Sequence, residues 1–327
     1  MVLILSSPGD LSTELVMDWL RNYQHPFLKI NSQDFLEKDI SFSLFPASLT
    51  IDSESFDIDE IGAVWYRKFG FFGRSPYYQK NKKKFSPGTA NQLKQEFQAI
   101  TQGFTSLFHN KYWLTQPHNA SPNKLVVLNL AQQCGLLIPT THIVNTREQL
   151  QNKLTQHSLI SKSAYEPFFM HDPKGMYSMY TKEVTPEIAD EFDATFFPSL
   201  LQEKVEKAYE LRIFYLEGKC YSMAIFSQQD EKTAIDFRMY DHESPTRSVP
   251  YILPETIRHQ LQQMMEKMDL NCGSIDMIRA SNGNYYFLEV NPVGQFGMTS
   301  IPCNYDLHEV VAKHLIQKDL EYEKIHA

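Results

Sequence analysis

Hydrophobic positions near the start of the chain follow the pattern of an α/β domain. An apolar run, residues 1–5, ends at the turn-forming stretch Ser7-Pro8-Gly9-Asp10, and apolar residues then recur with helical spacing over residues 11–20. Residues 61–67, IGAVWYR, have the composition of a second buried strand. The order strand, turn, helix predicts an N-terminal α/β domain.

Polar and turn-forming residues mark the end of this domain. Residues 68–88 are rich in Gly, Pro and Lys, which predicts an irregular, exposed stretch, and a polar helix is expected over about 91–108. The segment LTQPHNASPN has the composition of a linker and places a boundary near residue 118. Beyond it, Ser121 as N-cap and Pro122 at the first helical position predict a helix that Gly135 ends.

The second half of the chain has mainly strand patterns. From about residue 159 to 292, short alternating or apolar segments are joined by tight turns, and one helix is expected over about 254–268. The whole chain therefore predicts a mixed α/β (α+β) fold.

Composition and charge restrict the function classes. The chain has 327 residues, 42% of them hydrophobic, and a net charge of -8, so general attraction to nucleic acid or to anionic lipid is not expected. Its apolar runs are shorter than the roughly 18 residues of a membrane span, and we expect a cytoplasmic protein without nucleic-acid or membrane partners. The four cysteines contain no C-x-x-C, which favours reduced core thiols over a zinc site or disulfides.

A hairpin near the C-terminus carries the clearest chemistry. Asn282-Gly283 between SIDMIRA and YYFLEV predicts a two-residue type I′ turn, and counting outward from it places Asp276 opposite Glu289. Directly opposed carboxylates repel each other, so something cationic is expected between them. Asn291 lies two residues further on the same face. Three hard oxygen donors suit Mg²⁺, and the alternative is that the carboxylates face solvent or pair with Arg and Lys.

The residues Asp276, Glu289 and Asn291 within FLEVNP resemble the metal-binding end of the ATP-grasp ligases. The resemblance implies an ATP-grasp fold with ATP and Mg²⁺ as cofactors and three parts: an N-terminal pre-ATP-grasp domain (1–118), a central subdomain (119–200) and a C-terminal subdomain (201–327). It assigns nucleotide phosphates to Lys124 and Lys162. A lysine in the first turn of a helix opposes the macrodipole, and a bound anion would remove that penalty.

The same resemblance identifies further nucleotide and catalytic residues. The hinge backbone at Glu203, Lys204 and Val205 would hold adenine, and Gln202 or Glu203 would line the nucleotide. Two acid and arginine pairs, each two residues apart, would act on the phosphoryl group, with the arginines stabilising the transition state: Glu210 with Arg212, and Asp236 with Arg238. Asp236 and Glu210 are the two candidates for a general base.

A narrower resemblance covers almost the whole chain and is most specific over about 196–305. Segments such as VWYRKFGFF, IDFRMY and FLEVNPVGQFGMTSIPCNY are similar to the grasp-with-spasm peptide maturases, relatives of the microviridin ligases. It implies a graspetide synthetase that phosphorylates Asp or Glu side chains of a precursor peptide and forms side-chain esters with Ser or Thr, or amides with Lys. It also implies a homodimer. The glycine-rich loop that many ATP-grasp ligases carry after the second lysine is missing here.

The precursor peptide would contact two further places. Arg67 and Lys68, at the end of a buried strand, would receive its acidic core by charge attraction. A hairpin over 222–238, with a polar tip at 228–232, is a candidate clamp for its leader. The lysine run at 80–84 is interpreted as a solvated loop, with nucleic-acid binding as the alternative.

Two other functions remain open from the sequence. An ATP-grasp carboxylate-amine ligase acting on free amino acids or on a protein tail would use the same ATP chemistry with a different acceptor. A nucleotide-binding regulator without catalysis would not need the complete set of lysines, metal ligands and arginines.

Overall fold

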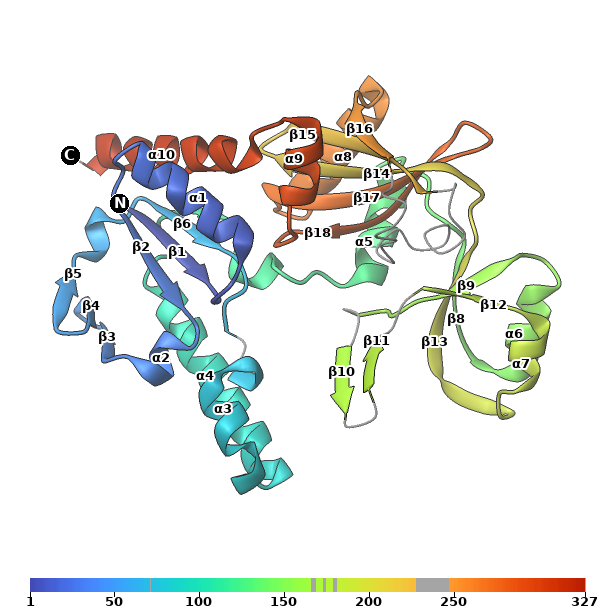
Figure 1. Ribbon diagram of the computed structural model, residues 1–327, viewed down its shortest axis with the longest axis horizontal. Coiled ribbons are helices and arrows are strands. Elements are labelled where there is room, and N and C mark those ends of the chain that lie inside the picture. Colours follow the sequence, from blue (N-terminus) through green and yellow to red (C-terminus); the bar gives the residue numbers. More distant parts are fainter. Residues whose placement is uncertain (71, 166–168, 173–174, 179–180, 228–246, 327) are drawn as a thin grey trace. The chain divides into compact units, whose positions relative to one another are not determined.

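The computed structural model describes residues 1–327 except 71, 166–168, 173–174, 179–180, 228–246 and 327 (Figure 1). The chain forms two compact units: unit 1 is Met1–Ala120 with Pro292–Ala327, and unit 2 is Ser121–Asn291. The first division lies close to the linker that composition indicated near residue 118. The segment Pro292–Ala327 belongs to unit 1, whereas the sequence analysis assigned it to the C-terminal part 201–327.

Unit 1 is built on a parallel sheet of four strands in the order β2-β1-β6-β7 (Figure 1). The strands are β1 (Val2–Ser6), β2 (Phe27–Asn31), β6 (Ala63–Tyr66) and β7 (Tyr112–Leu114). All five residues of β1 are buried, as expected for a parallel strand covered on both faces. The strand, turn and helix order predicted for the first 20 residues is therefore present.

The other elements of unit 1 surround this sheet. Leu3 and Leu5 share a core with Phe104, Phe108 and Leu49, and helices α1 and α10 lie side by side (Figure 1). Strands β3 to β5 form an antiparallel sheet of their own. The bounds are α1 (Leu11–Asn22), α2 (Asp34–Glu37), β3 (Ile40–Leu44), β4 (Ala47–Ile51), β5 (Glu54–Phe56), η1 (Ile58–Glu60), η4 (Pro117–Asn119), α9 (Gly297–Cys303) and α10 (Leu307–His326).

Residues 72–106 form a helical hairpin, where the sequence analysis expected an irregular stretch up to residue 88. Its elements are η2 (Phe72–Arg74), α3 (Pro76–Asn81), η3 (Lys82–Lys84) and α4 (Pro87–Ser106). Ser75 and Ser86 each cap a helix whose first residue is proline, and this local signal outweighs the Gly and Lys content. The ring of Phe72 packs against Tyr78 and Phe97, which holds the hairpin together.

Unit 2 contains two antiparallel sheets joined at residues 203–207. The first has the order β12-β9-β13-β8, and α6 and α7 contribute Leu150 and Ala189 to its core. A separate hairpin, β10 with β11, follows β9. The bounds are β8 (Thr141–Thr146), α6 (Arg147–Leu154), β9 (Leu159–Ser161), β10 (Phe169–Asp172), β11 (Gly175–Ser178), β12 (Lys182–Val184), α7 (Pro186–Asp190) and β13 (Thr195–Glu203).

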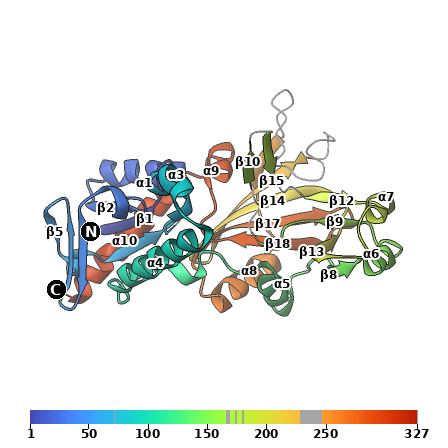
Figure 2. The ribbon, with the colours of Figure 1, turned by 90° about the horizontal axis from the view of Figure 1, so that it is seen from below.

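The second sheet of unit 2 has one apolar and one polar face. Its order is β16-β15-β14-β17-β18, and α5 and α8 cover the apolar face (Figure 2). Leu211, Ile213, Ile275 and Met277 alternate along β14 and β17 toward these helices. The bounds are α5 (Lys124–Gln133), β14 (Lys207–Leu216), β15 (Lys219–Phe226), β16 (Arg247–Tyr251), α8 (Glu255–Lys267), β17 (Cys272–Ala280) and β18 (Tyr285–Asn291).

Helix α5 begins two residues later than predicted, at Lys124 instead of Pro122. Asn123 is the N-cap, and its side chain accepts hydrogen bonds from the amides of Leu125 (3.0 Å) and Val126 (3.2 Å). The predicted N-cap, Ser121, therefore lies outside the helix. Lys124 is the first helical residue, which keeps it at the positive end of the helix dipole.

The turn between β17 and β18 also differs from the predicted one. The Ala280 amide donates to the Asn284 carbonyl (2.9 Å), and within the turn Gly283 has a positive φ, at 92°. This is a three-residue loop with a left-handed glycine, and the predicted two-residue type I′ turn is wrong. Tyr285 consequently pairs with Arg279 instead of Ala280. A bulge at Leu288 then shifts the register by one residue, so Asp276 pairs with Glu289 as predicted.

None of the helices in the described part of the chain has the length and apolar character needed to cross a bilayer.

Gly62 allows α10 to approach the sheet of unit 1 closely. Its amide donates to Asp319 Oδ1 (2.8 Å), and His25 Nε2 lies 2.7 Å from Asp319 Oδ2. A Cβ at position 62 would lie 2.7 Å from Asp319 Oδ1 and 2.8 Å from the Asp319 carbonyl oxygen. Real Cβ atoms do not come this close, so only glycine fits here without movement of α10.

We predict that Gly62→Ala destabilises the chain by about 1 to 3 kcal/mol, because the added methyl group forces α10 away from the sheet. Urea unfolding followed by circular dichroism measures the change. Gly103→Ala is the matched control, since the space around Gly103 is open within 4 Å and alanine is favoured inside α4. Equal midpoints for the two variants would contradict the packing described for Gly62.

Candidate active site

Three ionised side chains lie in one row across the polar face of the second sheet of unit 2. Arg212 on β14 pairs in register with Asp276 on β17, which pairs with Glu289 on β18. Asn291 lies two residues beyond Glu289 and pairs with Ser274. The predicted juxtaposition of Asp276 with Glu289 is confirmed, and the row exists because these three strands are neighbours.

Each carboxylate of the row has a cation of its own. Arg212 NH1 lies 2.6 Å from Asp276 Oδ1, and Lys124 Nζ lies 3.0 Å from Glu289 Oε2. Lys124 Nζ also donates to the carbonyl of Ser163 (3.2 Å). The resulting order, cation, anion, anion, cation, offsets the repulsion between the opposed carboxylates. The alternative that the sequence left open, pairing of the carboxylates with Arg and Lys, is therefore present.

The guanidinium of Arg212 has hydrogen-bonding capacity left over. Its Nε is buried and has no acceptor among the described residues, while NH1 is held by Asp276. Leaving a buried donor unsatisfied costs about 1 to 3 kcal/mol. An oxygen-rich anion such as a phosphate would satisfy it.

The two carboxylates and Asn291 are the metal ligands that the sequence predicted. Among the residues that the structure describes, no three His, Cys, Asp or Glu side chains gather into a metal site. Two carboxylates and one amide oxygen suit Mg²⁺, which is commonly bound by one or two carboxylates plus water and substrate phosphates. These three oxygen ligands therefore fit a metal ion that binds together with a nucleotide. They fit a metal site made only of protein side chains less well.

Gln202 occupies the middle of the other sheet of unit 2. It lies on β13 between Thr141 and Ile160, is completely buried and donates through Nε2 to Thr141 Oγ1 (2.9 Å). Its Oε1 has no donor among the residues with a described position. An acceptor of this kind fits an amino group such as that of adenine.

The hinge residues after Gln202 use their side chains within their own sheet. Glu203 accepts a hydrogen bond from Thr140 Oγ1 (2.8 Å), and Lys204 Nζ lies 2.6 Å from Glu183. The amide of Val205 has no partner in the described part of the chain, whereas that of Lys204 donates to Ser158. Any nucleotide contact at the hinge is therefore expected from the backbone, as the resemblance implied.

Lys162 directly follows β9, and its amide donates to the Leu200 carbonyl (3.4 Å). Because the next residue, Ser163, accepts a hydrogen bond from Lys124, the two lysines assigned to phosphate lie on segments in contact.

Glu210 lies two residues before Arg212 on the same face of β14. It is buried, pairs with Lys207 and accepts a hydrogen bond from Ser227 Oγ (3.3 Å). Burial raises the pKa of Glu210, Lys207 opposes this effect, and the negative charge of Asp276 adds to it, so the pKa stays above its ordinary value. Lys207 and Ser227 were not predicted as partners of Glu210, although Lys207 lies only three residues before it in the sequence.

Asp236 and Arg238 lie outside the described residues, and so does the predicted clamp tip at 228–232.

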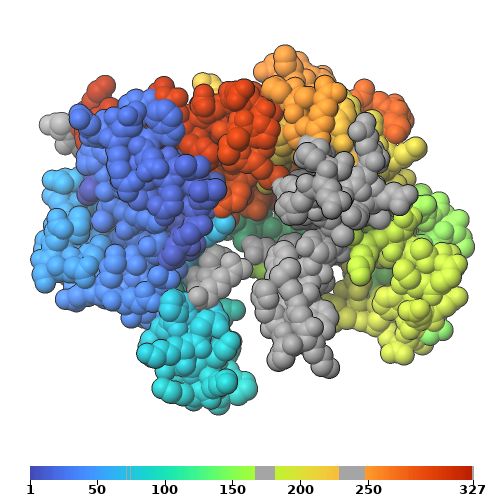
Figure 3. Space-filling view, in the orientation of Figure 1, coloured from blue at the N-terminus to red at the C-terminus, as the bar shows by residue number. Residues whose placement is uncertain are grey.

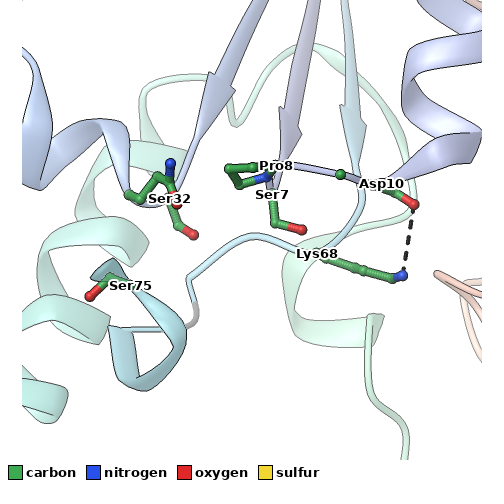
Figure 4. A pocket seen from close by; sticks show the side chains of 8 residues that line it. Ser7, Pro8, Asp10, Ser32, Lys68 and Ser75 are labelled. Atoms are coloured by element: carbon green, nitrogen blue, oxygen red, sulfur yellow. Dashed lines mark ion pairs between the residues drawn. The ribbon is translucent and has the colours of Figure 1, made fainter. Parts of the chain in front are cut away.

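Arg67 has an internal partner, which differs from the expected contact with a precursor peptide. It is buried, its Nε donates to Asp10 Oδ2 (3.0 Å) and its NH1 donates to the Gly294 carbonyl (3.1 Å). Burial alone would raise the pKa of Asp10, but the charge of Arg67 and hydrogen bonds from Arg67, Thr13 and Gln295 outweigh it and hold that pKa well below its usual range. Lys68 Nζ lies 3.7 Å from Asp10 Oδ1 (Figure 4). The side chain of Lys68 is one-third exposed.

Neither a protein-family model nor the sequence of a curated protein matches the chain. A RiPP-associated ATP-grasp ligase from Chryseobacterium gregarium, solved with ADP and a leader and core peptide, has a TM-score of 0.84 and 22% identity, covering 97% of this chain and 96% of that one.

Two further solved structures are similar. The macrocyclase MdnC from Microcystis aeruginosa MRC, bound to its precursor peptide MdnA, has a TM-score of 0.82 and 26% identity, covering 97% of this chain and 99% of that one. The ATP-grasp ligase PsnB, complexed with a minimal precursor, Mg and ADP, has a TM-score of 0.77 and 18% identity, with 97% of each chain covered. The chain has the ATP-grasp fold, and the resemblance that the sequence indicated is confirmed.

The buried ion pair of Asp10 and Arg67 yields a stability prediction. Asp10→Asn leaves the Arg67 charge buried without its counter-ion, which costs about 3 to 5 kcal/mol at pH 7. Because the pKa of Asp10 is lowered by folding, its contribution is complete above the unfolded value of 3.8 and is lost as the pH falls below it. The difference between wild type and variant in urea unfolding therefore narrows from about pH 5 downward. A difference that does not change with pH would contradict the assignment.

Proposed function

We propose that this chain is an ADP-forming ligase that joins side chains within a ribosomally made precursor peptide. The observation that carries the proposal is the row Lys124, Glu289, Asp276 and Arg212 on one face of a sheet. The solved neighbours with ADP and precursor peptides support the same conclusion. The reaction forms an ester from Asp or Glu with Ser or Thr, or an amide with Lys.

The first chemical step activates a carboxylate of the peptide. One of its oxygens bonds to the γ-phosphorus of ATP, the bond to the bridging oxygen breaks, and ADP leaves with that electron pair. Such a transfer needs positioning and charge stabilisation more than covalent help from the protein. Arg212, whose Nε lacks an acceptor among the described residues, is the cation for the transferring group, and Lys124 and Lys162 hold the phosphates.

The second step closes the ring. A hydroxyl or amine of the same peptide bonds to the carbonyl carbon, phosphate leaves, and the nucleophile gives its proton to a base. Glu210 is our candidate for that base, because its raised pKa brings it nearer to neutral pH than an ordinary carboxylate. Asp236, which lies outside the described residues, is the other candidate, together with Arg238 as a second cation.

Ligand binding changes the partners of the charged row. Asp276, Glu289 and Asn291 would hold Mg²⁺, which supplies positive charge at the phosphate oxygens when it is bound. With the nucleotide bound, Lys124 and Arg212 would pair with its phosphates instead of with Glu289 and Asp276. The two cations and the two carboxylates of the row would therefore each have a partner of opposite charge both without and with the nucleotide. Neither Lys124 nor Arg212 would be left buried without a counter-ion.

The adenine end is assigned to the first sheet of unit 2. Gln202 Oε1 has no donor in the described part of the chain, and the Val205 amide has no acceptor there; these two groups match the amino group and a ring nitrogen of adenine. Glu203 and Lys204 contribute their backbone.

The partner is a precursor peptide with a leader and an acidic core. Of the two residues assigned to that core, Lys68 is the one with exposed surface. A homodimer, the absence of nucleic-acid partners and a cytoplasmic location stay predictions from the sequence.

Co-expression tests the proposal. The chain is produced with a short reading frame beside its gene that is rich in Thr, Asp and Glu, and the peptide is analysed by mass spectrometry. We expect the loss of one water per ring and one ADP released per ring. Arg212→Met should lower the rate of ADP formation by about a hundredfold or more, as for loss of one transition-state cation.

Arg258→Met is the matched control, since Arg258 lies exposed on α8 and pairs only with Glu255 among the described residues. ADP release with free amino acids and none with the peptide would favour the alternative ligase. The absence of ADP release with either acceptor would refute the proposal.

A further inference from the structure

Strand β3 (Ile40–Leu44) is an edge strand of the antiparallel sheet of unit 1 that has the order β3-β4-β5. Among the described elements it pairs with β4 alone, over five residues and without a bulge. Figure 3 shows residues of this sheet, in lighter blue, at the surface of unit 1. The other side of β3 has no strand beside it in the described part of the chain, and such an edge is a template for pairing with another strand.

The edge of β3 lacks the protection that other edge strands of this chain have. Strand β5, on the opposite side of the same sheet, has three residues and begins with Glu54. The edge strand β12 has three residues, including Lys182, and the edge strand β16 contains Arg247 and Pro250. Short length, charge and proline all hinder pairing at an edge. By contrast, residues 40–51, which form β3, β4 and the turn between them, contain no charged residue, and β3 itself contains no proline.

The hydrogen bonds between β3 and β4 show which backbone groups point to the open side. The Asp52 amide donates to the Asp39 carbonyl (2.8 Å), directly before the first residue of β3. Hydrogen-bonded pairs alternate along an antiparallel ladder, so Ser41 and Ser43 are the residues that exchange bonds with β4. The amide and the carbonyl of Phe42, the middle residue of β3, consequently point away from β4.

The sequence of β3 is complementary to itself when two copies run antiparallel with Phe42 opposite Phe42 of the second copy. Each Phe42 amide then donates to the Phe42 carbonyl of the other copy. Ser41 faces Ser43 of the second copy, which allows a hydrogen bond between the hydroxyl groups. Ile40 faces Leu44, whose side chain is 44% exposed. Apolar residues thus face apolar residues and serine faces serine, so no like charges are opposed.

The residues beyond both ends of β3 fit the same register. Asp39 lies opposite Phe45 of the second copy and Lys38 lies opposite Pro46, so charged residues again face uncharged ones. Residues 44–47, Leu-Phe-Pro-Ala, are all exposed, and Phe45 is exposed to 93%. A run of exposed apolar residues of this length indicates a contact surface. Pairing of two copies through β3 covers part of this run.

We propose that β3 pairs antiparallel with β3 of a second copy of this chain, which joins two three-stranded sheets into one continuous sheet across a twofold axis. Such an interface is isologous, because both copies use the same surface and the pairing closes on itself. A second copy is favoured over an unrelated peptide because the side chains of β3 match the strand itself in register and in polarity. The homodimer that the resemblance implied had no assigned surface, and β3 supplies one that does not depend on the proposed ligase activity.

Sedimentation velocity of the full chain tests the pairing. Wild type should sediment as a dimer of the 38.0 kDa chain. In the double variant Ser41→Lys with Ser43→Lys, lysine opposes lysine across the axis, so the dissociation constant of the dimer should rise at least about tenfold. Ser41→Glu with Ser43→Glu should weaken the dimer in the same way. An equimolar mixture of the two double variants should restore the wild-type constant to within about threefold, because each lysine then faces a glutamate.

Ser55→Lys is the matched control, since Ser55 is an exposed serine of β5, the other edge of the same sheet. This variant should remain as dimeric as wild type. Three outcomes would overturn the proposal: a monomeric wild type, a dimer that the double lysine substitution leaves unchanged, or a mixture of the two double variants that stays monomeric.

Thermal melting identifies a double variant that fails to fold, and Leu44→Pro then takes its place. The amide of Leu44, two residues after Phe42, also points away from β4, so proline removes a hydrogen-bond donor from the open edge alone. The dimer should again weaken at least about tenfold, since one donor of the interface is lost from each copy. An unchanged dissociation constant for a folded Leu44→Pro variant would also overturn the proposal.

Discussion

The direct opposition of two carboxylates across neighbouring strands is the constraint on which this site depends. Asp276 and Glu289 face each other on β17 and β18, and such a pair is unfavourable without positive charge nearby. Arg212 comes from the next strand of the same sheet and Lys124 from the first turn of α5. The order of the strands and the position of α5 thus place two cations next to the two carboxylates. Their positive charge offsets the repulsion that would otherwise destabilise the sheet.

Two arginines of this chain pair with carboxylates, and their hydrogen bonding separates a structural role from a catalytic one. Arg67 uses Nε, NH1 and NH2 on Asp10 and on the Gly294 carbonyl, so all its nitrogens are engaged. Arg212 uses NH1 on Asp276, while its buried Nε has no acceptor among the described residues. A protein tolerates the cost of an unsatisfied donor where a ligand removes it. Arg67 therefore stabilises unit 1, and Arg212 is available to a phosphate.

The sequence predicted which carboxylates of the two strands face each other, but it did not predict the local geometry that brings them together. Asp276 was placed opposite Glu289 from a type I′ turn, yet the real loop is one residue longer and the bulge at Leu288 restores the pairing. The extra loop residue and the bulge shift the register in opposite directions, so the predicted pairing was correct although the predicted turn was wrong. The sequence contained no signal for the longer loop or for the bulge, because the turn type at Asn-Gly and the position of a bulge depend on packing along the whole hairpin.

Contacts between distant segments were beyond the reach of sequence reasoning. Arg67 was assigned to a peptide because nothing near it in the sequence suggested Asp10, 57 residues away, as its partner. The return of Pro292–Ala327 to unit 1 had no compositional marker either. By contrast, Lys124 was located correctly from its place in the first helical turn, since that argument uses only local structure.

Calorimetric titration of ADP, with and without Mg²⁺, tests whether Asp276 and Glu289 hold the metal ion that accompanies the nucleotide. Mg²⁺ should strengthen ADP binding to the wild type by about tenfold or more, because Asp276 and Glu289 would hold the metal ion together with the nucleotide. In the double variant Asp276→Asn with Glu289→Gln this dependence on Mg²⁺ should disappear. An equal effect of Mg²⁺ on both proteins, or no effect on the wild type, would contradict the assignment of these two carboxylates to the metal ion.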